Sequence, residues 1–382
     1  MRPSAFIPTP TRPALRNRRA MGTILVVAAL AVACAPPVTE TSAARPAPSA
    51  APPPVATEEW PLKTREHVDL WLHGYALITT DTATVPLFRR GYADSVRRRK
   101  AELGVVTVLD ANQDELQKQL AARPSLEQGQ FVPLYFADWA ELKRAVDAFM
   151  ETDGDPRRAS SPQLARMVAF LAGSFPTPAD RDWLRLFVMG LEDEEVRFFA
   201  SYWGEQQAAR APVLSTVQST WQGAVRPALQ RFLNNTRQNT GDIMLSLPIG
   251  GEGRMVPGGS TENVVAVTFP ATAADAEQAI YVFVHEIVGQ VTQQVVDDNT
   301  TPAQKRDGVA TRLQSTSLVR GGELLLRRAV PSLADGYMRF YLAEAGHQPG
   351  NALRTEFERA FPLPDALVEA LDRQIGVILG GI

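Results

Sequence analysis

Apolar residues recur at spacings of three and four along most of the chain between residues 58 and 238, which is the spacing of one buried helix face. Several of these segments open on Ser, Asp or Pro, residues that are favoured at helix N-termini. Clear examples are REHVDLWLHGYALI, NQDELQKQLAA, WAELKRAVDAFM and VLSTVQSTWQGAVRPALQRFLNNT. The pattern predicts that residues 58–238 form a helical subdomain.

The pattern changes at residue 239. The runs DIMLSLPI and NVVAVTFP are rich in β-branched and aliphatic residues and predict two strands, joined by the glycine-rich loop GGEGRMVPGGSTE. Helical spacing then resumes over residues 273–296, 302–328 and 333–345, and in LPDALVEALDRQIGVIL. The expected fold class is mainly α, of the α+β type. A small antiparallel sheet and further helices are expected over residues 239–382.

The N-terminal 33 residues have the composition of a secretion signal. Arginines are followed by an uncharged apolar run from Met21 to Val32, which is too short to cross a bilayer comfortably. The small residues that precede Cys34 resemble the lipobox of bacterial lipoproteins, in which the cysteine carries the lipid and becomes the new N-terminus. Two alternatives are an ordinary signal peptide that is cleaved near a cysteine, and a start codon set too early.

The lipobox resemblance implies an exported protein that contacts the membrane through a lipid on Cys34. Ala-Pro follows the cysteine, without Asp, which favours the outer membrane over the inner membrane. Residues 34–57 are rich in Pro, Ala, Ser and Thr and predict an extended tether. Cys34 is the only cysteine, so no intramolecular disulfide is expected.

The charge of the chain bears on its partners. Loss of residues 1–33 would remove five arginines and no acid, and would change the formal net charge from −3 to −8. We find no Lys/Arg-rich patch with interleaved aromatic residues, so nucleic acid is not an expected partner. The acidic run EDEE, Glu192–Glu195, has the composition of a solvated helix face.

Candidate chemistry is concentrated in YVFVHEIVGQ, residues 281–290. Zinc hydrolases place two histidines four residues apart on one helix, with a glutamate after the first to act as base. Here His285 and Glu286 fit the first two positions, but Gly289 stands where the second histidine would be.

Residues 258–326 resemble the gluzincin superfamily and, within it, the M1-type metallopeptidases. GGSTEN, residues 258–263, is similar to their amine-binding loop, HEIVGQ is a degenerate form of their His-Glu-x-x-His motif, and RGGELLL follows on the next predicted helix. The resemblance implies a zincin-like domain with His285 and Glu323 as metal ligands and Glu286 as catalytic base. Glu262 and Asn263 would bind substrate.

Gly289 has no side chain to donate, and two protein ligands rarely hold zinc. We therefore expect no cofactor and a degenerate, non-catalytic domain that serves as a binding or structural module of a cell-envelope lipoprotein. The first alternative is a zinc-dependent peptidase with an atypical second ligand. The second is a purely helical envelope protein without a site, in which His285 is a buried residue bonded to Glu286, Glu323 or a carbonyl, and Gly289 allows another backbone to approach.

Overall fold

Helices fill most of the chain from residue 66 to residue 235, as the apolar spacing predicts. The structure is a computed structural model that describes residues 60–80, 82–257 and 263–380. Asp138 and Ser161 show how helices begin here, because each side chain accepts the backbone N–H of the residue three positions on. The first helices are α1 Glu66–Ile78, α2 Tyr92–Leu103, α3 Val108–Ala111, α4 Gln113–Ala122, α5 Trp139–Glu151 and α6 Pro162–Ser174, with 3-10 turns at Pro124–Gly129, Val132–Tyr135 and Pro156–Arg158.

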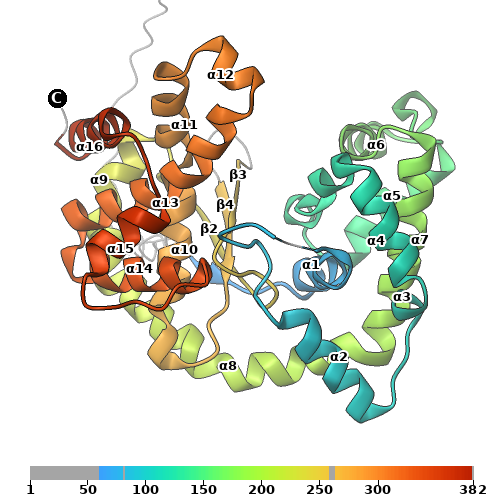
Figure 1. Ribbon diagram of the computed structural model, residues 1–382. Coiled ribbons are helices and arrows are strands. Elements are labelled where there is room, and N and C mark those ends of the chain that lie inside the picture. The colour runs from blue at the N-terminus through green and yellow to red at the C-terminus, as the bar shows by residue number, and fades with distance from the viewer. Residues whose placement is uncertain (1–59, 81, 258–262, 381–382) are drawn as a thin grey trace, which may run out of the picture. The chain divides into compact units, whose positions relative to one another are not determined.

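Three further helices follow one another without a break: α7 Pro178–Glu194, α8 Ala200–Thr220 and α9 Arg226–Asn235. They are joined by two π-helical turns, Glu195–Phe199 and Trp221–Val225. A π-helical turn admits an extra residue without ending the helix, and it shifts which side chains face the core. α8 packs against α10 (Glu277–Ile287) and so connects the earlier helices to the later ones (Figure 1).

The strands form one small sheet in the order β1-β2-β4-β3. Its strands are β1 Leu62–Lys63, β2 Gly241–Ser246, β3 Arg254–Pro257 and β4 Asn263–Thr268. The fold class predicted from the sequence, mainly α with a small sheet, is confirmed, and the chain is not purely helical.

The expectation of an antiparallel sheet was wrong in its detail. β2 and β4, the two predicted strands, run parallel, and β1 is parallel to β2. Among the strands of the described residues, only β3 and β4 pair antiparallel. The reason is that part of the predicted loop forms β3 on the far edge of β4, so the chain reverses direction before β4 begins. β1 has two residues, too few for a periodic signal, and it brings the start of the predicted helical subdomain into the sheet.

The later helices are α10, α11 Gly289–Asp298, α12 Pro302–Arg306, α13 Val309–Ala329, α14 Pro331–Glu344, α15 Leu353–Ala360 and α16 Asp365–Gly380, with a 3-10 turn at Ala273–Asp275. They gather beside the sheet in Figure 1, and α10 packs directly on β4. The ring of Phe283 on α10 packs at steep angles, 81° and 67°, against the rings of Trp60 and Trp221, with centroids 5.1 and 4.7 Å apart. These buried rings join the residue that precedes β1, the long helical segment and α10 in one core.

The helix predicted over residues 273–296 is interrupted. Val288, with φ −77° and ψ −7°, ends α10, and α11 begins at Gly289. The apolar spacing continues across this point, so the sequence pattern does not reveal the break. Similarly, Gly308 adopts a φ of +69°, and the predicted helix 302–328 is divided there into α12 and α13.

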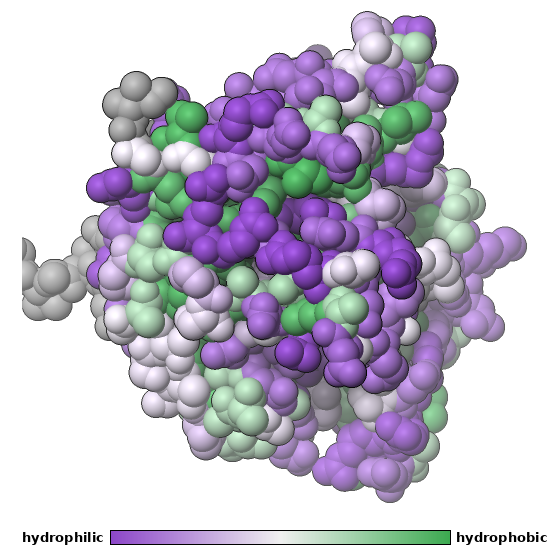
Figure 2. Space-filling model, turned by 60° about the vertical axis from the view of Figure 1, so that its left-hand side comes forward, coloured by the Kyte–Doolittle hydropathy of each residue, from purple (hydrophilic) through white to green (hydrophobic). Residues whose placement is uncertain are grey.

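The surface and the helix lengths bear on membrane contact. In the face shown in Figure 2, hydrophilic residues predominate and apolar residues occur in small groups between them. In the part of the chain that the structure describes, no helix is both long and apolar enough to cross a membrane. The predicted signal peptide, lipid anchor and tether lie outside the described residues.

Candidate functional site

His285 is buried on α10, at the edge of a cavity of about 460 Å³. Its Nδ1 lies 2.8 Å from Oε1 of Glu286, and its ring stacks on Tyr341 with centroids 5.4 Å apart. Ser315 and Arg312 of α13 also line the cavity. The imidazole is therefore oriented from one side by a carboxylate and from its face by a phenol ring.

The carboxylate of Glu286 holds strand β3 against helix α10. Its Oε1 accepts the backbone N–H of Gly253 at 3.3 Å, and its Oε2 accepts that of Met255 at 2.9 Å. Burial raises the pKa of Glu286, but the hydrogen bond and charge of His285, the charge of Arg254 and the Met255 N–H together lower it below its ordinary value. The ionised carboxylate of Glu286, which accepts two backbone N–H groups from Gly253 and Met255, therefore has a structural role.

Close packing at this point requires a glycine at residue 253. A Cβ on Gly253 would lie 2.5 Å from the carbonyl oxygen of Ala266 and 2.9 Å from Cγ of Glu286. Gly289, in contrast, has room. A Cβ there would meet only Cδ2 of Leu318, at 3.8 Å, so the expectation that a backbone crosses close to Gly289 was wrong.

Glu323 is buried on α13 and is paired with two arginines. Its Oε1 lies 3.1 Å from Nη2 of Arg354 on α15 and 3.6 Å from Nη1 of Arg327, one helical turn further along α13. No local sequence pattern predicts the contact with Arg354, which lies 31 residues further along the chain. The charge of this carboxylate is thus balanced within the fold.

These donors fit a zinc site poorly. Gly289 supplies no ligand, Glu286 bonds strand amides and Glu323 is held by arginines. Among the residues that the structure describes, no group of three or more His, Cys, Asp and Glu side chains is arranged to hold a metal ion. Asn263, at the start of β4, donates its Nδ2 to the carbonyl of Thr240 at 3.0 Å. Glu262 and Cys34 lie outside the described residues.

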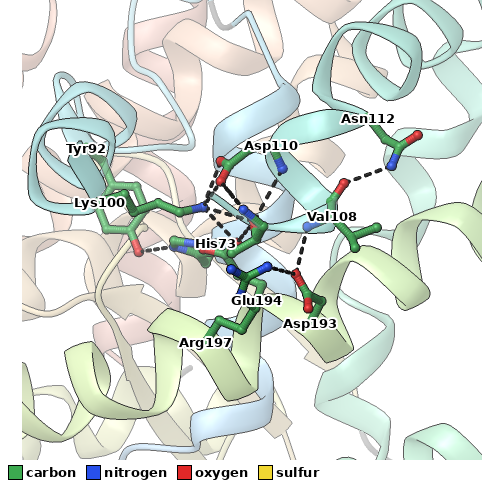
Figure 3. Close-up of polar contacts among 10 residues, drawn as sticks. His73, Tyr92, Lys100, Val108, Asp110, Asn112, Asp193, Glu194 and Arg197 are labelled. Atoms are coloured by element: carbon green, nitrogen blue, oxygen red, sulfur yellow. Dashed lines mark hydrogen bonds and ion pairs between the residues drawn. The ribbon is translucent and has the colours of Figure 1, made fainter. Parts of the chain in front are cut away.

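A second histidine–glutamate pair joins helices that are distant in sequence. Nε2 of His73 on α1 lies 3.0 Å from Oε1 of Glu194 at the end of α7, and its Nδ1 lies 2.9 Å from the hydroxyl of Tyr92 (Figure 3). Both members of the pair are fully buried. The expectation that residues 192–195 form a solvated face was therefore wrong for Glu194, because the helix turns this residue inward just before the first π-helical turn.

The second oxygen of Glu194 binds a buried lysine. Nζ of Lys100 lies 2.8 Å from Oε2 of Glu194 and 2.6 Å from Oδ2 of Asp110 (Figure 3). Thr107 donates its hydroxyl to the same glutamate oxygen. Burial raises the pKa of Glu194, but the hydrogen bond and charge of His73 and the charge of Lys100 lower it, to about 2. Such a fully partnered network ties α1, α2, α3 and α7 together.

Only one part of this network was visible in the sequence. Thr107 and Asp110 form a capping box at α3, a pattern with a fixed spacing of three residues. The contacts of Glu194 with His73 and Lys100 span 121 and 94 residues, and no local pattern announces them.

No family model, curated protein or solved structure matches the chain. The structure therefore defines the fold class of the chain: mainly α, of the α+β type, with a four-stranded mixed sheet in the described residues.

Proposed function

We propose that the chain is an exported, lipid-anchored envelope protein whose C-terminal part is a non-hydrolytic binding or structural module with a degenerate zincin-like motif. The observation that carries the proposal is the use of Glu286. A zincin needs this carboxylate free to act on water, whereas here both of its oxygens accept backbone N–H groups at the sheet edge. The pairing of Glu323 with Arg354 and Arg327 supports the same conclusion.

A zinc-dependent peptidase with an atypical second ligand is the second candidate. One observation favours it: His285 lines a cavity of about 460 Å³ together with polar side chains of α13. A histidine at a cavity wall that is oriented by a carboxylate is a common arrangement for acid–base chemistry.

Metal content and hydrolysis separate the two candidates. The full-length protein should contain well under one equivalent of zinc by elemental analysis, and a chelator should leave its thermal unfolding midpoint unchanged. It should release no fluorophore from a panel of aminoacyl coumarin amides, and Glu286→Gln should not alter that background. Stoichiometric zinc together with hydrolysis that Glu286→Gln abolishes would establish the peptidase instead.

The anchor is tested separately from the folded domain. Cys34→Ala should move the protein from the membrane fraction to the soluble fraction, and metabolic labelling with a fatty-acid analogue should be lost. Retention of the variant in the membrane with unchanged labelling would contradict lipidation at Cys34.

A further inference from the structure

A cavity of about 730 Å³ lies between α2 and the N-terminal half of α8, and it shares no lining residue with the cavity at His285. Five arginines line it: Arg89, Arg90, Arg98, Arg99 and Arg210. Glu102 is the one acidic residue of this lining, and it pairs with Arg99 at 3.5 Å. Arg99 also pairs with Glu205 of α8, at 3.3 Å. The cavity wall therefore carries a large excess of positive charge.

Most of these guanidinium groups have neutral partners or none. Nη2 of Arg89 donates to the hydroxyl of Thr268 at 2.8 Å and to the carbonyl of Phe269 at 2.6 Å. Nε of Arg210 donates to the carbonyl of Pro270 at 3.2 Å. Arg98 makes no hydrogen bond or ion pair with the described residues. Backbone carbonyls orient such groups but do not cancel their charge.

The arginines also affect one another. Burial lowers the pKa of Arg89 below its ordinary value, and the neighbouring charge of Arg210 lowers it further. Near the wall, burial raises the pKa of Asp69 to about 7 and also raises the pKa of Glu344. A dianion in the cavity would remove this repulsion and gain charge-assisted hydrogen bonds.

The backbone adds to the positive potential. Gly91 precedes α2 with a φ of +74° and provides no side-chain cap, so the first amides of a 12-residue helix are not covered by a capping side chain. The N-terminus of a helix carries a partial positive charge that favours anions. Tyr92 at this end and Tyr202 on α8 contribute aromatic surface to the lining.

We propose that this cavity binds a small organic phosphate, with the phosphate group held by arginines of α2 and α8. Guanidinium groups on two helices can donate to several oxygens of one phosphate group, whereas a carboxylate offers only two oxygens. The volume lies in the range of small-molecule sites and exceeds the needs of a bare phosphate ion, and the tyrosines offer contact to an organic body. This inference rests on the proposed binding role and names its ligand class.

Titration calorimetry on the full-length protein tests the site with inorganic phosphate, pyrophosphate and succinate at constant ionic strength. We expect phosphate and pyrophosphate to bind saturably at one site, and succinate to bind at least about tenfold more weakly. Arg210→Gln should weaken pyrophosphate binding about tenfold, the usual effect of one lost charge-assisted hydrogen bond.

Two exposed arginines provide a matched comparison that does not threaten folding. Arg98→Gln, in the cavity wall, should weaken pyrophosphate binding several-fold. Arg144→Gln, on α5 and outside the lining, changes the net charge equally and should have no effect. Absence of saturable binding, equal effects of the two variants, or succinate binding as tight as phosphate would overturn the proposal.

The outcome is independent of the zinc and hydrolysis assays. If the protein is not a hydrolase and does not bind phosphate, only the proposed phosphate site is wrong. If the protein is a zinc peptidase and binds pyrophosphate through Arg98 and Arg210, the proposed function is wrong and the phosphate site is confirmed.

Discussion

In the part of the chain that the structure describes, two histidine–glutamate pairs differ in almost every physical respect. His285 and Glu286 are adjacent in sequence, lie on one helix and border a cavity. His73 and Glu194 are 121 residues apart, lie on different helices and are fully buried. The first pair resembles a catalytic motif, whereas the second has no motif at all.

The difference lies in what each carboxylate binds. Glu194 is bonded to His73, Lys100 and Thr107, and its pKa falls to about 2. Glu286 has one imidazole neighbour and otherwise bonds strand amides. A motif reports which residue types are adjacent, but the partners that decide the role of a carboxylate come from elsewhere in the chain.

The largest effect should come from breaking the buried network. Lys100→Met leaves Glu194 and Asp110 without their shared cation in the protein interior, and the free energy of unfolding should fall by about 3–5 kcal/mol. Urea unfolding followed by circular dichroism measures this, with Lys118→Met on the exposed face of α4 as the control. A loss below about 1 kcal/mol would mean that the network is solvated and not sealed.

Acid should weaken the same network. The pKa of Glu194 is lowered in the fold from 4.5 to about 2, so its ionisation stabilises the protein above pH 4.5 and this contribution is lost as the pH falls towards 2. The stability difference between wild type and Glu194→Gln should shrink by about 2 kcal/mol between pH 6 and pH 3. Urea titrations at both pH values measure it. A difference that stays constant with pH would contradict the lowered pKa.

The sequence predicted the parts of the fold that depend on local periodicity. Apolar spacing located the helices, and β-branched runs located β2 and β4. It could not predict that β2 and β4 run parallel, because their direction is set by β3, which lies in a glycine-rich segment. The break at Val288 was also hidden, since the apolar spacing is the same on both sides.

The candidate sites show the same limit. The sequence motif identified His285 and Glu286 as candidate site residues, but it did not predict the backbone amides at β3 that bond to Glu286. From the sequence we predicted no basic patch with aromatic residues, and that prediction missed RRGYADSVRRRK, residues 89–100, which holds six basic residues and Tyr92. Arg210, more than a hundred residues later, completes the cavity only through the packing of α8.

The next effect concerns the join between Glu286 and β3. In Gly253→Ala the new methyl group would lie 2.5 Å from the carbonyl oxygen of Ala266 on β4 and 2.9 Å from Cγ of Glu286 on α10, so the chain before β3 would have to move away from both. We expect a loss of about 1–3 kcal/mol in the free energy of unfolding, through overpacking. Urea unfolding measures the loss, and hydrogen exchange should show faster exchange of the Met255 amide. An unchanged Met255 amide would mean that Glu286 does not depend on this close contact.

The smallest effect distinguishes the two glycines that flank the His285–Glu286 motif in space. Gly289→Ala places a methyl group 3.8 Å from Cδ2 of Leu318, which is an ordinary contact, and Gly289 does not have a positive φ. Replacing glycine by alanine in a compatible helical position restricts the unfolded chain, so stability should rise by about 0.5 kcal/mol. The same urea experiment measures this gain beside the loss in Gly253→Ala. If Gly289→Ala instead destabilises the protein by as much as Gly253→Ala does, then the turn at Val288 requires glycine after it, and the missing second histidine of the motif would have a structural cause.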